Sequence, residues 1–209
     1  MDTKRAYVSP LRASGAARTR ETILACATDL FAERGYGLVT VADIAAAAGV
    51  SPKTVFASVG SKREILDLIV DAGVTASGYE AVMQEVLQLT DQQEILRALA
   101  HGTRVGNQTQ FAVHEVVRRA LPVHEESEAL LQRATAEYRA ALRSAAGRIH
   151  QVASEQVVYT ETQTADLLWL WFGPTSWHQL VAENGWSWDD AEQSLYRTSV
   201  AALFGRRPT

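Results

Sequence analysis

Hydrophobic residues return along most of this 209-residue chain every three or four positions, which is the spacing of one face of an amphipathic α-helix. Glycine, proline and N-capping residues divide the pattern into about nine segments, and no segment alternates as a β-strand does. Two short helices are expected between residues 40 and 62. The longer helices are expected near residues 17–34, 61–87, 92–104, 109–121, 125–151, 162–184 and 188–204. The pattern therefore predicts an all-α fold.

One short stretch carries the clearest local signals. Thr40 is followed three residues later by Asp43, which is typical of a capped helix start. Gly49 allows a sharp turn, because a residue without Cβ reaches the left-handed conformation at low cost. Ser51 can cap a second helix whose first residue is Pro52, where no backbone N–H is needed. The stretch therefore predicts two short helices joined by a glycine turn.

The second of these helices would leave a small and mostly uncharged surface facing outward. This surface consists of Lys53, Thr54, Phe56, Ala57 and Ser58. A helix of this kind can enter the major groove of DNA and contact base edges. Ser61 and Glu64 form a capping box that starts the following helix. A helical hairpin inside an all-α domain, without DNA binding, is the alternative interpretation.

Residues Thr19–Leu66 resemble the N-terminal domain of the TetR/AcrR transcriptional regulators. The matching residues are Leu30–Tyr36, Thr40, Ile44, Ala45, Ala48, Gly49, Val50, Ser51, Thr54, Ser61 and Lys62. A mixture of Gly, Pro, Ser and basic residues without periodicity predicts a flexible basic arm over residues 1–16, and the resemblance implies a three-helix helix-turn-helix domain over 17–63. It also implies an effector-binding and dimerisation domain over 64–209. In that family the helix that joins the two domains carries the signal, and here Gly73 and Gly78 predict a bend in it.

The resemblance and the exposed pattern together mark the residues that we expect to contact DNA. They are Arg18, Arg20, Thr40, Ser51, Pro52, Lys53, Thr54, Phe56, Ala57, Ser58 and Lys62. Lys53 can donate to guanine and Thr54 can touch a thymine methyl or a phosphate. Phosphate contact alone is the alternative for Lys53. Phe56 stands where the family usually has a tyrosine whose hydroxyl bonds a phosphate, and Ser58 stands where it has a histidine.

The formal net charge of −4 is distributed unevenly along the chain. Residues 1–63 carry nine Lys and Arg against five Asp and Glu, whereas the remainder carries eleven against nineteen. A basic N-terminal surface that faces phosphate is therefore expected. The single cysteine and the lack of a signal-like or long apolar segment predict a cytoplasmic protein without a disulfide, a metal site or a membrane span.

The last two helices are unusually apolar, so we expect a second subunit to cover part of their surface. Their large apolar residues are Trp169, Trp171, Phe172, Trp177, Leu180, Leu203 and Phe204. The resemblance implies a homodimer through these helices, which would place two recognition helices in successive major grooves. It also implies a largely apolar effector cavity in each subunit. The candidate lining residues are Arg104, Asn107, Phe111, His114, Tyr138, Trp169 and Trp171, with core or interface packing as the alternative for each.

These observations favour a ligand-responsive transcriptional regulator, a repressor that a small molecule releases from a double-stranded DNA operator. The sequence has no Walker loop, GxSxG, dinucleotide fingerprint or cluster of metal ligands, so no cofactor is expected. An enzyme whose scattered histidines converge in the fold is one alternative. A small-molecule-binding protein with a degenerate DNA-binding domain is another, because Phe56, Ser58 and Val59 depart from the family pattern.

Overall fold

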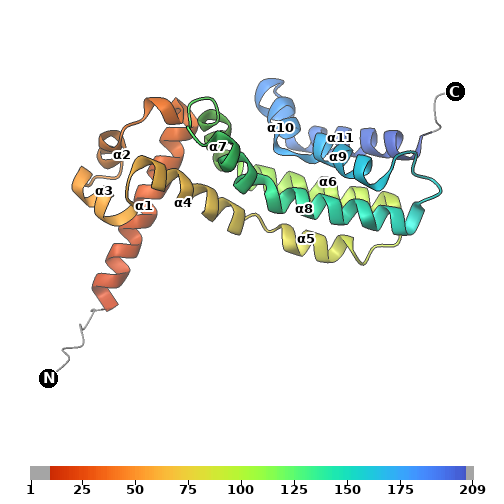
Figure 1. Ribbon diagram of the computed structural model, residues 1–209, viewed down its shortest axis with the longest axis horizontal. Coiled ribbons are helices and arrows are strands. Elements are labelled where there is room, and N and C mark those ends of the chain that lie inside the picture. Colours follow the sequence, from red (N-terminus) through yellow and green to blue (C-terminus); the bar gives the residue numbers. More distant parts are fainter. Residues whose placement is uncertain (1–9, 206–209) are drawn as a thin grey trace. The chain divides into compact units, whose positions relative to one another are not determined.

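The computed structural model describes residues 10–205, with side chains from residue 14 onward, and this part of the chain contains helices and no strand. The N-terminal elements are α1 (Pro10–Arg34), the 3-10 turn η1 (Tyr36–Leu38), α2 (Val41–Ala47), α3 (Pro52–Val59), α4 (Lys62–Thr75) and α5 (Tyr79–Val86). The following elements are α6 (Gln92–Thr109), α7 (Phe111–Ala120), α8 (Ser127–Ala153), α9 (Glu161–Phe172), α10 (Pro174–Trp177), the π-helical turn η2 (His178–Glu183) and α11 (Trp188–Phe204). Figure 1 shows their order along the chain. The predicted all-α class is confirmed.

Two of the helices expected from the sequence are divided in the structure. The helix expected over 61–87 becomes α4 and α5, because Gly78 adopts the left-handed conformation with φ of 67°. The helix expected over 162–184 breaks after Phe172, where extended Gly173 caps α9 and Pro174 begins α10. The remaining part of that segment closes as a π-helical turn.

Two boundary predictions are wrong, namely the start of the first helix and the end of the helix expected over 92–104. The first helix begins at Pro10, so residues 10–16, which we expected in the flexible arm, are helical. Lys4 and Arg5 of that arm lie outside the described residues. Gly102 and Gly106 do not end a helix, since α6 continues through both to Thr109. A glycine inside a helix weakens it by about 1 kcal/mol without breaking it, and packing around α6 outweighs that cost.

The described chain separates into two compact units. The first comprises the residues up to Gly73 together with Glu115–Leu131, and the second comprises Val74–His114 and the residues from Gln132 onward. The segment 115–131, which we expected in the C-terminal domain, therefore belongs with the N-terminal helices. Within the first unit, Arg119 donates to the Glu33 carbonyl at 3.3 Å, and the rings of Tyr36 and His124 lie 5.7 Å apart.

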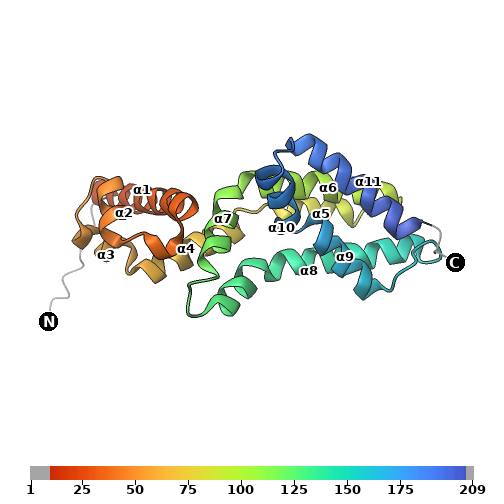
Figure 2. The ribbon, with the colours of Figure 1, turned by 90° about the horizontal axis from the view of Figure 1, so that it is seen from above.

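The first unit is built on α1, against which both α2 and α3 pack (Figure 2). α1 buries an apolar face, and the two short helices add two buried residues each. The buried residues of these helices are Ile23, Ala27, Leu30, Phe31, Ile44, Ala45, Val55 and Val59. Helices of seven and eight residues are not stable alone, so this packing supplies most of their stability.

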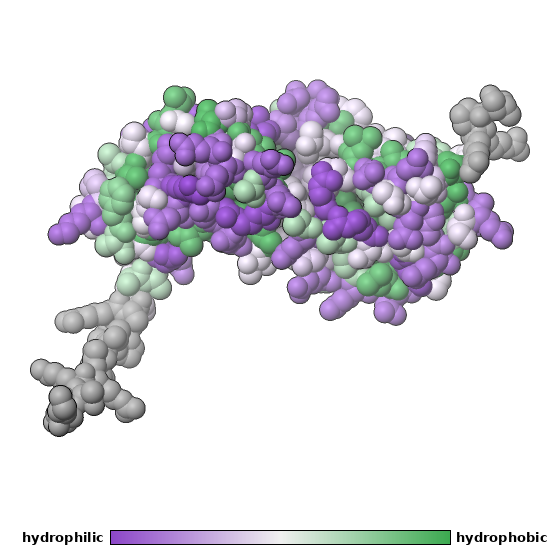
Figure 3. Space-filling model, in the orientation of Figure 1, coloured by the Kyte–Doolittle hydropathy of each residue, from purple (hydrophilic) through white to green (hydrophobic). Residues whose placement is uncertain are grey.

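The second unit has its own core, in which α6 packs against α11, α9 and α5. Its largest buried side chains come from the apolar tail of the chain: Trp171, Phe172, Trp177 and Leu203 are at most 9% exposed. These four side chains therefore lie in the core of a single subunit. Only Trp169, Leu180 and Phe204 of the expected set stay partly exposed. In Figure 3 the hydrophobic residues on the visible face form small separate groups among hydrophilic ones.

Gly102 allows α5 and α6 to approach closely within the second unit. A Cβ added at Gly102 would lie 2.5 Å from Cγ1 and 2.7 Å from Cγ2 of Val82. Val82 is β-branched, so its methyl groups have little freedom to move away. A Cβ at Gly106, four residues further along the same helix, would meet only the Ser77 carbonyl oxygen at 3.7 Å. The two glycines of α6 are therefore not equivalent.

We expect Gly102→Ala to lower the free energy of unfolding, because overpacking of about 1–3 kcal/mol outweighs the gain in helix propensity. Gly106→Ala is the matched control and should raise stability by up to about 1 kcal/mol. Urea denaturation of the two variants and the parent measures the difference. Adding Val82→Ala should reverse the loss, with a coupling of at least about 0.5 kcal/mol in the double-mutant cycle. Equal effects at the two glycines would contradict the close approach.

Candidate functional site

The starts of α2 and α4 are fixed by capping boxes, as the sequence predicts. The Asp43 backbone N–H donates to the Thr40 hydroxyl at 3.2 Å, and the Thr40 backbone N–H and hydroxyl donate to the Asp43 carboxylate at 2.8 and 2.6 Å. These bonds hold the pKa of Asp43 below its ordinary value. Ser61 and Glu64 repeat the arrangement at α4, and there too the pKa of the carboxyl is lowered by the bonds from Ser61. The Thr40 hydroxyl is thus already engaged within the protein.

The start of α3 is capped by Ser51, whose hydroxyl oxygen accepts from the Thr54 backbone N–H at 3.2 Å. The same oxygen lies 2.9 Å from the Thr54 hydroxyl oxygen, so the two hydroxyls also share a hydrogen bond. Both residues were expected to contact DNA. Their side chains instead meet each other first, while their outer atoms remain open to contact along an exposed edge of α3.

Lys62 is held within the first unit. Its ammonium donates to the carbonyl oxygens of Tyr36 at 2.8 Å and Val39 at 2.9 Å, and it lies 4.3 Å from the centre of the Tyr36 ring. Partial burial lowers the pKa of this ammonium. The two carbonyls belong to the turn between α1 and α2, so Lys62 ties the start of α4 to the segment that leads into α2. We expected it to bind phosphate, and its donors are directed at the protein.

Arg20 is also bonded inside the first unit. Its Nη1 donates to the Ser58 carbonyl oxygen at 2.5 Å, which links α1 to the last turn of α3. A cation at the C-terminal end of a helix is stabilised by the helix dipole and satisfies an otherwise unpaired carbonyl. Arg20 therefore holds the far end of α3 in place. Arg18, two residues nearer the start of α1, is exposed.

The outer face of α3 is formed by the residues that no packing covers. Pro52, Lys53, Phe56 and Ala57 are exposed, and the Phe56 side chain is 56% exposed. Val55 and Val59 are buried on the opposite face. Lys53 is the one charged residue within α3. The face is therefore short, largely apolar and singly charged, and its position is fixed by a cap at one end and Arg20 at the other.

Two of the expected effector residues form a buried polar network in the second unit. Asn107 is 2% exposed, and its Nδ2 donates to the Thr103 carbonyl at 2.7 Å and to the Tyr138 hydroxyl oxygen at 3.1 Å. The Tyr138 hydroxyl donates in turn to the Phe172 carbonyl at 2.5 Å. Burial raises the pKa of Tyr138, so the hydroxyl keeps its proton.

This network also fixes the orientation of the Asn107 amide. Both of its neighbours present oxygen atoms as acceptors, so the Nδ2 end must face them. Its Oδ1 is left buried without a hydrogen-bond partner among the described residues. A buried acceptor of this kind costs about 1–3 kcal/mol when it stays unsatisfied.

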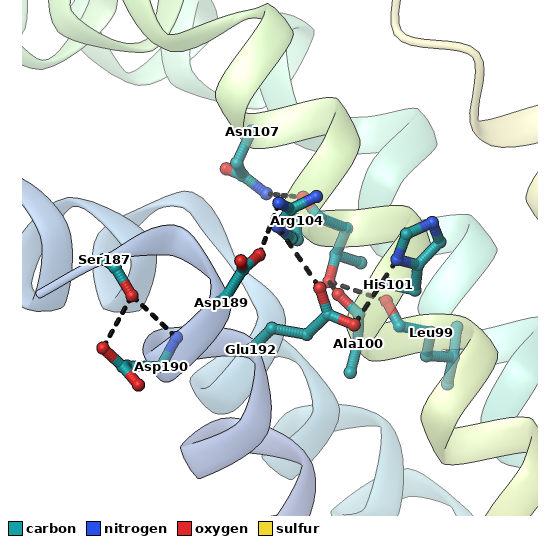
Figure 4. Close-up of polar contacts among 10 residues, drawn as sticks. Leu99, Ala100, His101, Arg104, Asn107, Ser187, Asp189, Asp190 and Glu192 are labelled. Carbon is teal, nitrogen blue, oxygen red and sulfur yellow. Dashed lines mark hydrogen bonds and ion pairs between the residues drawn. The ribbon is translucent and has the colours of Figure 1, made fainter.

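Arg104 lies one turn before Asn107 on α6, in an ion-pair cluster with the start of α11 (Figure 4). Its Nη2 donates to Asp189 Oδ1 at 2.6 Å, and its Nε lies 3.3 Å from Glu192 Oε2. His101 Nδ1 lies 3.4 Å from the other oxygen of Glu192. The sequence offered no signal for the two acids, because they are 85 and 88 residues away from Arg104.

The other expected effector residues do not gather in one place. Trp169 packs edge-on against Tyr138 with ring centres 5.6 Å apart, so it joins the network of Asn107. Phe111 stacks on His178 at 6.3 Å and meets Trp188 edge-on at 6.0 Å. Trp171 is buried in the core, and His114 is half-buried. The sequence analysis did not find Trp188 and His178 as neighbours of Phe111. The periodicity of a helix shows which residues are buried but not which helix they face.

The described residues provide neither a metal centre nor a membrane span. Within residues 10–205, no group of three or more His, Cys, Asp or Glu is arranged to hold a metal ion. None of the helices in the same range combines the length and the apolarity that a membrane crossing requires.

The helix-turn-helix segment matches a known protein family. Residues 23–69 match the family model of bacterial regulatory proteins of the tetR family, a range that contains α2, α3 and the start of α4. No curated protein matches the sequence closely enough to count as a relative.

Several solved structures share the fold over most of the chain. A putative transcriptional regulator from Saccharomonospora viridis, solved in complex with choline, matches with a TM-score of 0.70 and 20% identity, over 91% of this chain and 100% of that one. The TetR family regulator PfmR from Thermus thermophilus matches with a TM-score of 0.63 and 20% identity, over 91% and 98%. The fatty acid degradation regulator FadR from Bacillus halodurans matches with a TM-score of 0.64 and 16% identity, over 97% and 100%. Residues 23–69 therefore carry a sequence of the tetR family of bacterial regulatory proteins, and the chain as a whole shares the fold of these solved regulators.

Proposed function

We propose that this protein is a transcriptional repressor that binds a near-palindromic DNA site as a homodimer and is released by a small molecule. The outer face of α3 carries this proposal. It exposes Lys53 and Phe56 on a helix whose two ends are fixed, and a rigid helix with a free outer face can enter the major groove. The net positive charge of residues 1–63 supports approach to phosphate. A regulator of this kind acts in the cytoplasm, where bacterial DNA lies.

The contacts within the first unit divide its basic residues into two groups. Lys53 and Arg18 are exposed and remain the best candidates for DNA contact. Lys62 and Arg20 donate to backbone carbonyls of the protein and act first as positioning residues for α2 and α3. Thr40 and Ser51 serve as helix caps, and Pro52, Thr54, Ala57 and Ser58 stay candidates for contact along the edges of α3.

We expect Lys53→Ala and Lys62→Ala to weaken operator binding for different reasons. Lys53→Ala should leave the free energy of unfolding within about 0.5 kcal/mol of the parent, flatten the salt dependence of binding and relax the preference at one base pair. Lys62→Ala should lower the free energy of unfolding by about 1–3 kcal/mol, because two carbonyls lose a charged donor, and leave the salt slope unchanged. Operator selection from random DNA, gel-shift titration at several salt concentrations and urea denaturation measure all three quantities.

Lys62→Arg separates the two roles of this position. An arginine keeps the charge that a phosphate contact needs, but its planar guanidinium does not fit between the carbonyls of Tyr36 and Val39 as an ammonium does. A stable Lys62→Ala protein with a flattened salt slope would show that Lys62 binds phosphate. Failure of the parent protein to select any DNA sequence would refute the regulator itself.

The proposed effector site lies in the second unit, around Asn107. Its Oδ1 is buried and without a partner among the described residues, while Tyr138 and Trp169 beside it are aromatic. An effector that is largely apolar and carries one hydrogen-bond donor would supply the partner that this acceptor lacks. The Saccharomonospora viridis regulator was solved with choline, a small molecule with a hydroxyl donor, which makes choline a suitable first probe here.

We expect Asn107→Leu to reduce the ability of any releasing compound to displace the operator by about tenfold, because the compound loses its buried acceptor. The variant should still bind the operator, since Asn107 lies in the second unit and α3 in the first. Fluorescence anisotropy of labelled operator, titrated with choline and then with a library of small apolar donors, measures release. Gln108→Leu, the same kind of change at the exposed neighbour of Asn107 on α6, is the control. Undiminished release from Asn107→Leu would place the effector elsewhere.

Fewer apolar residues of α9 and α11 are exposed for dimerisation than the sequence suggested. Most of the tail is internal core, but Leu170 on α9 is 60% exposed and Phe204 on α11 is partly exposed. On the same two helices, Leu167 is partly exposed and Ala201 is exposed. A mixed surface with a small apolar centre is typical of protein interfaces.

We expect Leu170→Glu to weaken the dimer at least tenfold, because a carboxylate would be buried at the interface without a partner. Sedimentation velocity over a range of concentrations measures the dissociation constant. Val105→Glu is the matched control, since Val105 is 44% exposed but lies on α6, outside the two helices. Equal dimerisation of both variants would show that the interface is not formed by α9.

One alternative has an observation in its favour. Arg20 and Lys62 are bonded to the protein, and Phe56 has no hydroxyl for a phosphate, so the first unit offers fewer polar DNA contacts than the sequence suggested. A small-molecule-binding protein that no longer recognises DNA would have this character. The operator selection described above separates it from the regulator.

A further inference from the structure

The exposed stripe of α3 combines one charged side chain with apolar ones. Lys53, Phe56 and Ala57 are spaced i, i+3 and i+4, so they lie side by side on one face of the helix, and all three are exposed. Val55 and Val59 are buried on the other side. The stripe is therefore directed away from the core of the first unit.

The packing of the first unit does not depend on the Phe56 ring. Its side chain is 56% exposed, and its backbone carbonyl accepts from the Gly60 N–H at 3.1 Å as an ordinary part of the helix end. A large aromatic ring left in water loses the free energy that burial would give it. A ligand that covers the stripe would therefore gain most from contact with this ring.

The chemistry of the major groove restricts what this ring can recognise. A phenylalanine has no donor or acceptor, so it cannot distinguish the polar edges of guanine, cytosine or adenine. The one apolar group in the major groove is the C5-methyl of thymine. Lys53, in contrast, can donate to the O6 and N7 atoms of guanine.

The helix spacing also sets a distance between the two contacts. Side chains three residues apart on a helix have Cβ atoms about 5–6 Å apart. Successive bases along one strand rise by about 3.4 Å. Contacts by Lys53 and Phe56 would therefore lie about one or two base steps apart.

We propose that Phe56 is a specificity-determining residue that packs against a thymine methyl, one or two base steps from a guanine that Lys53 contacts. The inference rests on the proposed DNA binding and adds the operator chemistry to it. A half-site read by this stripe then contains a guanine and a nearby thymine, and the thymine is recognised through its methyl group alone.

Replacement of single thymines by deoxyuridine tests the proposal, because uracil differs from thymine only in lacking the C5-methyl. The operator is first selected from random DNA with the full-length protein, and each thymine of the half-site is then replaced in turn. For the parent protein, one replacement near the guanine should weaken binding about fourfold, as expected for the loss of one buried carbon group. Phe56→Ala should bind the thymine and uracil operators equally.

Two further variants make the result specific to the ring. Phe56→Tyr keeps the ring and should keep the preference for thymine over uracil. Lys53→Ala should lose its preference for guanine but still distinguish thymine from uracil. Urea denaturation of each variant checks that an altered preference does not come from partial unfolding.

Several results would overturn the proposal. One is a selected half-site without a thymine within two steps of its preferred guanine. Another is a uracil penalty that persists unchanged in Phe56→Ala, and a third is a general loss of affinity in Phe56→Ala with no uracil penalty in the parent, which would place the ring against the sugar-phosphate backbone. These results leave the regulator standing, whereas a parent protein that selects no DNA overturns the proposed function as well.

Discussion

Val55 and Val59 are the buried residues of α3, which packs against α1. The rest of the first unit depends on this burial. An eight-residue helix has too few internal hydrogen bonds to persist in water, so α3 exists because its apolar side is covered. The same burial decides which side chains face outward. Because the helix period is 3.6 residues, fixing two valines inside fixes Lys53 and Phe56 outside. Arg20 at the C-terminal end and Ser51 at the N-terminal end then limit how far α3 can shift. The face that α3 presents to its surroundings is therefore a consequence of its packing.

Some polar groups of the first unit hold its helices together, and the others remain available for contact with a ligand. Lys62 carries a charge that would suit a phosphate, yet its ammonium satisfies two carbonyls of the turn before α2. Those carbonyls belong to a segment outside the regular α-helices, so a nearby cation is strongly favoured there. The residues left for contact are then fewer and more apolar than charge counting suggests. If this face binds DNA as proposed, one lysine and one phenylalanine at its centre would give specificity through shape and methyl groups more than through ionic contacts.

The second unit places few polar groups in an apolar core. Trp171, Phe172 and Trp177 belong to the buried core that α6, α9 and α11 share, so these three side chains add little to the exposed surface of the tail. Within that core Asn107 and Tyr138 form a network in which Asn107 Oδ1 is the atom without a partner among the described residues. A low-dielectric core makes the unpaired acceptor costly, and it therefore favours any ligand or water that brings a donor. The chain passes between the two units within α4, α7 and α8, so a ligand at the proposed effector site would have three covalent connections to the first unit.

The sequence by itself determined the all-α class, the caps of α2, α3 and α4, and the turn at Gly49. Those features depend on neighbours within four residues, and local propensity acts over that range. It also indicated the outward face of α3, because Val55 and Val59 are four residues apart. Only the tertiary structure decided that Lys62 and Arg20 bond to the protein, that Arg104 meets Asp189 and Glu192, and that the tryptophans of the tail belong to the core. The bonded partners lie between 23 and 88 residues apart in sequence, and no local pattern records which helices will pack together.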